Sequence, residues 1–117
     1  DILTGLYGVA TAGSATADLT TGIATTLNNL GAAAGKQGDL PRACRYYEES
    51  LALQREHGNV QGAAISLSNL GATAYDQGDY AEARKHAQVA WDLGSKDKNF
   101  FYRSAVEKAL KDWKNKN

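Results

Sequence analysis

The sequence contains one cysteine, one proline and no methionine in 117 residues. A single cysteine, Cys44, excludes a disulfide within the chain and fits a reducing compartment. No apolar run approaches the length of a membrane span, and no basic start precedes an apolar stretch as in a signal peptide. These features predict a cytoplasmic protein. The lack of methionine, even at position 1, predicts that the chain is a piece of a longer protein.

Charge is balanced overall but uneven along the chain. Thirteen Lys and Arg offset thirteen Asp and Glu, so no net field favours nucleic acid or an anionic membrane. Residues 1–35 contain no Lys or Arg, whereas residues 96–117 carry seven against three Asp and Glu. This basic tail is the one candidate for nucleic-acid binding, and it is more typical of a solvated helix face. We therefore expect no nucleic-acid partner and no membrane partner.

The chain repeats itself with a period of 40 residues. Segment 29–32 (Asn-Leu-Gly-Ala) recurs at 69–72, and segment 37–39 (Gln-Gly-Asp) recurs at 77–79. Without any gap, 14 of the 40 positions in 21–60 are identical to those in 61–100. The matches fall on small, apolar and turn residues, which indicates a repeated structural unit rather than a composition bias.

Within each repeat the apolar spacing is helical. Apolar residues follow a 4-3-4 spacing in both copies, which predicts an amphipathic helix. These are Ile23, Leu27, Leu30 and Ala34, then Ala63, Leu67, Leu70 and Ala74. A Gly-Asp pair follows each helix, where glycine ends one helix and aspartate caps the next. Each repeat is thus predicted to be a helix, a tight turn, a second helix and a short loop, which makes the chain all-α.

These residues resemble the tetratricopeptide repeat. The resemblance rests on Leu27, Leu30-Gly31, Ala34, Gly38-Asp39, Ala43 and Tyr47, and on their counterparts in 61–100, and it covers roughly residues 22–94. The usual period is about 34 residues, and the longer period here resembles the type found in kinesin light chains and in regulatory arms of bacterial proteins. The resemblance implies an α-solenoid of stacked helix hairpins, with about six helices, that binds other proteins.

The repeats define the expected organisation of the chain. Residues 1–20 match the second helix of a preceding unit and a loop, with Gly13-Ser14 expected to shorten or kink that helix. Residues 21–60 and 61–98 form the two complete repeats. Residues 99–117 lack the repeated Asn-Leu-Gly and are expected to form a capping helix with a basic tail.

No constellation in the sequence predicts catalysis, a metal or a cofactor. His57 and His86 stand in different repeats without metal-ligand spacing, and Cys44 lacks a nucleophile signature. Asp39 and Asp79 recur at the repeat period, which favours helix capping over acid–base chemistry. We expect a protein that is not an enzyme.

The first helix of each repeat is expected to line the concave side of the solenoid. The side chains expected on that face are Thr25, Asn28, Asn29, Lys36, Ile65, Ser68, Asn69, Tyr75 and Asp76, with Arg103 added from the last helix. In the family, the position of Asn29 and Asn69 commonly bonds the backbone of an extended peptide. The alternative is that each asparagine bonds its neighbouring helix. The lysine that would hold a C-terminal carboxylate is absent, because Ala32 and Ala72 stand at its positions.

Two functions of different classes remain open at this point. The first is a protein–protein interaction module that binds a peptide or protein segment in the concave groove, as part of a larger scaffold or signalling regulator. The second is a structural piece that self-assembles, with homo-oligomers formed by end-to-end stacking of exposed repeat surfaces.

Overall fold

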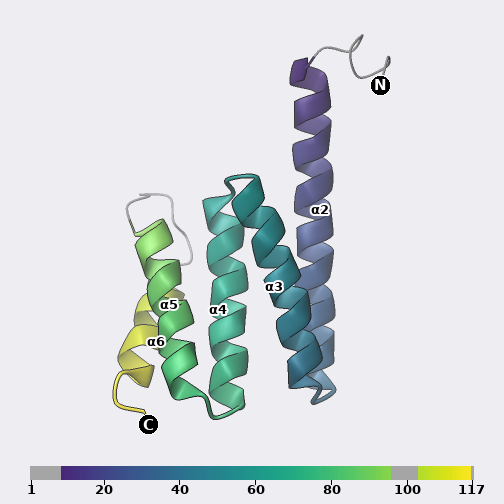
Figure 1. The fold of residues 1–117 in the computed structure, drawn as a ribbon. Coiled ribbons are helices and arrows are strands. Elements are labelled where there is room, and N and C mark those ends of the chain that lie inside the picture. Colours follow the sequence, from purple (N-terminus) through teal and green to yellow (C-terminus); the bar gives the residue numbers. More distant parts are fainter. Residues whose placement is uncertain (1–8, 96–102, 117) are drawn as a thin grey trace.

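The computed structural model describes residues 9–95 and 103–116, and this part of the chain is helical with no strand (Figure 1). The elements are α2 (Val9–Lys36), α3 (Leu40–Glu56), α4 (Val60–Asp76), α5 (Tyr80–Gly94) and α6 (Arg103–Trp113). The all-α prediction is confirmed. The helix predicted over the first residues lies partly outside the described residues.

Three sharp turns join α2 to α5, and each combines a left-handed glycine with a capping side chain. The glycines are Gly38, Gly58 and Gly78, with φ angles of 84°, 67° and 83°. The residue after each glycine caps the next helix: Asp39 accepts from the Arg42 amide at 3.2 Å and Asn59 accepts from the Gly62 amide at 2.9 Å. Only glycine enters the left-handed region without a steric cost, so the turns stand where the sequence places Gly-Asp or Gly-Asn.

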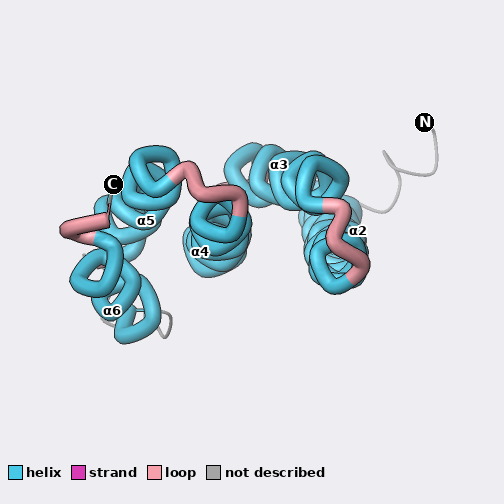
Figure 2. Tube along the Cα trace, turned by 90° about the horizontal axis from the view of Figure 1, so that it is seen from below, coloured by secondary structure: helices cyan, strands magenta, loops and turns pink. Residues whose placement is uncertain are grey.

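The helices form two rows. Viewed along their axes, α2, α4 and α6 lie on one side, and α3 and α5 lie on the other (Figure 2). The apolar contacts between the rows form two clusters. One joins Ala34, Ala43, Tyr47 and Leu70 from α2, α3 and α4. The other joins Ala64, Leu67, Ala90 and Val106 from α4, α5 and α6. The core is therefore a series of junctions, as expected when one hairpin cannot bury its apolar face alone.

At the N-terminal end the structure differs from the predicted organisation. The loop expected at the end of residues 1–20 is absent from the described part of that segment, because α2 runs unbroken from Val9 through Gly13-Ser14 to Lys36. The other turns end a helix at a left-handed glycine, and the position 40 residues before Gly58 is Asp18. Without that glycine nothing forces a reversal, so the helix continues for 28 residues. Figure 1 shows its N-terminal part extending beyond α3.

Part of the predicted apolar stripe on α2 is exposed. Leu30 is 43% exposed and Ile23 is 46% exposed, whereas their repeat equivalents Leu70 and Ala63 are 2% and 1% exposed. The face of α4 that carries Leu70 packs against α3. No described element packs against the corresponding face of α2. Of the predicted stripe on α2, Ala34 is therefore buried in the core, whereas Ile23 and Leu30 are exposed.

Helix α6 closes the other end of the described chain. Val106 is 1% exposed and packs in the cluster with α4 and α5. The Arg84 guanidinium on α5 donates from Nη1 to the carbonyl oxygens of Trp113, at 3.2 Å, and of Lys116. A cation on the last carbonyls of a helix satisfies acceptors that have no partner within the helix. The C-terminus of α6 is thereby tied to α5.

Candidate peptide-binding face

The predicted binding stripe lies on the row formed by α2, α4 and α6 (Figure 2). Asn29 on α2 is exposed, and Asn69 occupies the equivalent position on α4 and is partly exposed. The backbone carbonyl of Asn69 accepts from the Thr73 hydroxyl at 2.8 Å. We call the row's outward surface, marked by Asn29 and Asn69, the paired-asparagine face.

Asn28 is used within the fold. Its Oδ1 lies 3.2 Å from the Ser66 hydroxyl on α4, and Ser66 Oγ lies 3.1 Å from Ser50 Oγ on α3. Ser50 in turn donates to the Ala24 carbonyl of α2 at 2.9 Å. Because Ser50 and Ser66 are fully buried, these hydrogen bonds satisfy groups that water cannot reach. Asn28 therefore bonds the neighbouring helix, which is the role that the sequence left open as the alternative for Asn29 and Asn69.

The position equivalent to Asn28 in the next repeat makes no such hydrogen bond. Ser68 is the equivalent of Asn28, and its Oγ is buried without a hydrogen-bond partner. The residue equivalent to Ser66 is Val106, which cannot donate or accept a side-chain hydrogen bond. The second junction therefore has an apolar side chain at Val106 where the first has the Ser66 hydroxyl. Because the Ser68 Oγ is buried, the face gains no polar group from it.

Tyr75 stands in an aromatic cluster at the C-terminal end of α4. Its ring stacks on Trp113 of α6 with centroids 5.4 Å apart and meets Tyr80 edge-on at 5.0 Å. The Lys116 ammonium lies 5.9 Å from the Tyr75 ring centroid. Gly71 permits this packing, because a Cβ there would lie 3.2 Å from the Trp113 ring. Tyr75 is therefore an anchor between α4 and α6, and Trp113 is a contributor that the repeat pattern did not identify.

Arg103 lies at the other end of α6. Its guanidinium stands 5.3 Å from the ring centroid of Trp91 on α5. Trp113 is the tenth residue after Arg103 in the helix, which corresponds to about 15 Å along the axis. Tyr75 and Arg103 therefore do not form one site.

The remaining predicted residues fall into two groups. Thr25, Lys36 and Asp76 are exposed, and Ile65 is partly exposed. Lys36 and Asp76 are each the last residue of their helix, so they flank the turn end of the paired-asparagine face. The paired-asparagine face therefore carries the amides of Asn29 and Asn69 and the hydroxyl of Thr25. The opposite charges of Lys36 and Asp76 lie at its turn end.

Cys44, His57 and His86, which were considered for catalysis or metal binding, lie apart from one another in the sequence and contact their own neighbours. Burial, with a smaller effect of the nearby Glu48 carboxylate, raises the pKa of the Cys44 thiol, so the thiol is protonated at neutral pH. His57 Nε2 lies 3.3 Å from the Thr20 hydroxyl, and His86 Nε2 lies 3.2 Å from a Glu82 carboxylate oxygen one helical turn away. Among the described residues, no group of three His, Cys, Asp or Glu side chains is placed to hold a metal ion.

Comparison with known protein families finds a match. The family model for the tetratricopeptide repeat matches residues 22–93, which is more than half of the chain and spans both 40-residue repeats. The chain belongs to the tetratricopeptide repeat family. Tetratricopeptide repeats generally serve as protein–protein interaction modules, and the repeat fold is itself non-catalytic. No curated protein matches the sequence. None of the described helices combines the length and hydropathy that a membrane span needs.

Proposed function

We propose that this tetratricopeptide chain binds an extended segment of a partner protein on the paired-asparagine face, as part of a larger scaffold or signalling regulator in the cytoplasm. The observation that supports this most directly is the pairing of Asn29 and Asn69. They occupy equivalent positions on neighbouring first helices of the same row, and both are accessible. An amide side chain both donates and accepts, which matches the alternating groups of an extended backbone.

The double substitution Asn29→Ala and Asn69→Ala tests this site. Each lost hydrogen bond is worth about 1 kcal/mol, so the partner's affinity is expected to fall by about 30-fold for the two together. The readout is the set of proteins retained by the immobilised chain, followed by calorimetric titration of the partner so found.

The matched control is Glu48→Ala with Glu49→Ala on α3, in the opposite row of helices. Both glutamates are exposed, and neither is on the paired-asparagine face. The control variant is expected to retain the partner at wild-type affinity. Equal retention by the wild-type chain and the asparagine double variant would contradict the proposed site.

A second candidate function is self-association through α2. Three exposed large apolar side chains, Leu19, Ile23 and Leu30, lie on this helix and are 67%, 46% and 43% exposed. Their 4 and 7 residue spacing places them along one stripe. Large exposed apolar side chains that share one stripe favour an interaction site there.

Sedimentation velocity over a concentration series tests self-association. The sedimentation coefficient is expected to rise with concentration for the wild-type chain and to stay constant for Ile23→Glu, which places a charge in the stripe. Leu93→Glu is the control, because Leu93 is an exposed apolar residue on α5. A wild-type chain that remains monomeric at every concentration rejects this candidate.

A further inference from the structure

The two helices that carry the paired-asparagine face are poor in charge. Helix α2 has two charged side chains in 28 residues, Asp18 and Lys36, and α4 has one in 17 residues, Asp76. The opposite row differs, because α3 alone carries six charged side chains in 17 residues. Asp18 lies 18 residues before Lys36, about 27 Å along the axis. On the turn end of the face, Lys36 and Asp76 therefore set the field that a bound segment meets.

Lys36 and Asp76 lie on the same stripes as the two asparagines. Each stands seven residues after its asparagine, which is nearly two turns of helix and about 10 Å along the axis. Between asparagine and charge, Ala32 and Ala72 are both exposed. A methyl group leaves room for the aliphatic stem of a long side chain that passes over it. Each helix thus presents an amide, a small side chain and a charge, in this order toward its turn end.

Both charges are available to a ligand. Lys36 and Asp76 are exposed, and neither forms an ion pair or a side-chain hydrogen bond within residues 9–95 and 103–116. Two other charged groups at this end of the molecule have contacts of their own. The capping carboxylate of Asp79 accepts from a backbone amide of α5 at 3.1 Å, and the Lys116 ammonium lies 5.9 Å from the Tyr75 ring centroid.

The fold explains the charge of Lys36 but not that of Asp76. Each is the last residue of its helix. Because the C-terminal end of a helix carries a partial negative charge, a lysine there is stabilising and an aspartate is destabilising. Asp76 does not cap the next helix either, since Asp79 does so. The Asp76 carboxylate therefore makes no contact with the described residues that stabilises the fold, which favours a role in binding.

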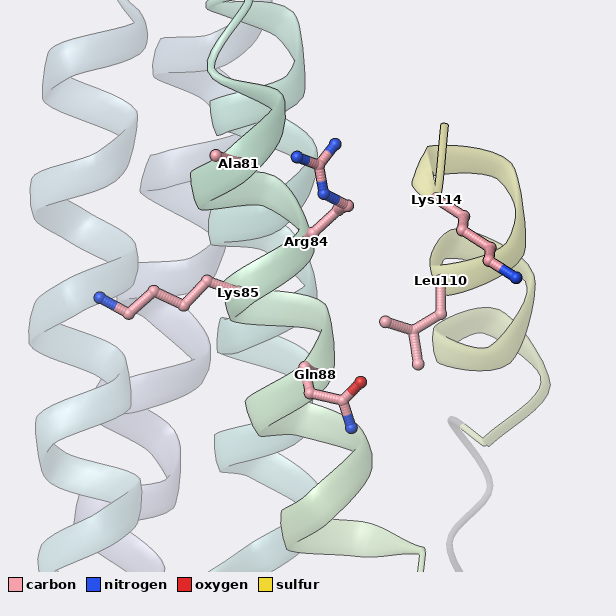
Figure 3. A pocket seen from close by; sticks show the side chains of 6 residues that line it. All are labelled: Ala81, Arg84, Lys85, Gln88, Leu110 and Lys114. Carbon is pink, nitrogen blue, oxygen red and sulfur yellow. The ribbon is translucent and has the colours of Figure 1, made fainter. Parts of the chain in front are cut away.

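The cations at the other end of the described solenoid do not offer a comparable site. A hollow of about 530 Å³ lies between α5 and α6 (Figure 3). Figure 3 shows Lys85 and Lys114 directed away from this hollow on its two sides. Arg84 Nη1 already donates to two carbonyl oxygens near the C-terminus of α6. The charges around this hollow are therefore turned outward or bonded within the fold.

We propose that the segment bound on the paired-asparagine face is mostly uncharged and carries one acidic and one basic side chain. This inference rests on the proposed function, in which the backbone of the segment bonds the two amides. The acidic side chain passes over Ala32 to Lys36 on α2. The basic side chain passes over Ala72 to Asp76 on α4. Charge complementarity selects this composition, because a segment with two acids or two bases would bring like charges together at one of the helices.

Selection from a phage-displayed library of random peptides on the immobilised 117-residue chain tests this composition. The wild-type chain is expected to enrich peptides with one acid and one base. Asp76→Lys gives the turn end of the face two cations and is expected to enrich peptides with two acids. Lys36→Glu gives it two carboxylates and is expected to enrich peptides with two bases.

Fluorescence anisotropy with a labelled copy of an enriched peptide measures the size of the effect. Replacing the base of that peptide with an acid is expected to weaken binding to the wild-type chain about fivefold, because one exposed attraction becomes a repulsion. The same replacement is expected to strengthen binding to Asp76→Lys by a similar factor. Both differences are expected to shrink at high salt.

Two controls separate this inference from the proposed function. Glu48→Lys on α3 makes the same change of charge in the opposite row and is expected to enrich the same peptides as the wild-type chain. Asn29→Ala with Asn69→Ala is expected to enrich none of them, and unchanged enrichment by this variant would contradict the proposed site. Peptides that need both asparagines but have the same charges whether selected on the wild-type chain or on Asp76→Lys would overturn this inference alone. A wild-type chain that enriches no peptide would contradict both.

Discussion

Replacing Leu70 with alanine is expected to lower the free energy of unfolding by about 2–5 kcal/mol, because it removes a buried side chain and leaves a cavity. Leu70 is 2% exposed and packs with Ala34, Ala43 and Tyr47 where α2, α3 and α4 meet. Leu70 is the α4 member of this cluster, so its truncation weakens the packing of α4 against α2 and α3. Urea unfolding followed by circular dichroism measures the change.

Leu30→Ala is the matched control, since Leu30 occupies the same position one repeat earlier. Leu30 is 43% exposed, so truncation removes little buried surface and is expected to cost less than about 1 kcal/mol. A Leu30→Ala cost as large as that of Leu70→Ala would show that the outer face of α2 is covered in solution. That result would favour the self-association candidate and contradict the exposed face described above.

Replacing Gly31 with alanine is expected to destabilise the chain by about 1–3 kcal/mol, the cost of overpacking a close contact. A Cβ at Gly31 would lie 2.6 Å from Cε1 of Tyr47. The Tyr47 ring is 7% exposed among neighbours of the first cluster, so it has little room to move aside. Thermal and urea unfolding of the variant measure the loss.

Gly22→Ala on the same helix is the control. A Cβ at Gly22 meets nothing within 4 Å, so the substitution adds helix propensity without a clash. It is expected to stabilise the chain by about 0.5–1 kcal/mol. If Gly31→Ala stabilised the chain as Gly22→Ala does, the close approach of α2 and α3 at this point would be wrong.

Some contacts on the paired-asparagine face could not be predicted from the sequence. Helical periodicity placed Asn28 and Asn29 on the outer side of the first helix, and the two are neighbours in the chain. They differ by about 100° around the axis, and only the position of α4 decides which of them is turned to Ser66. The same limit applies to Tyr75, because its stacking partner Trp113 is 38 residues further along the chain.

By itself the sequence determined the helices and turns from the Gly38-Asp39 turn to the end of α5, and the family. These features are local: a left-handed glycine, a capping aspartate and a 4-3-4 apolar spacing act over a few residues and appear in both repeats. Only the tertiary structure decided burial. Leu30 and Leu70 are the same residue in the same local pattern, yet one is exposed and the other is buried. Burial depends on which helix stands next to a side chain, and that neighbour is set by the stacking of hairpins in space rather than by the adjoining sequence.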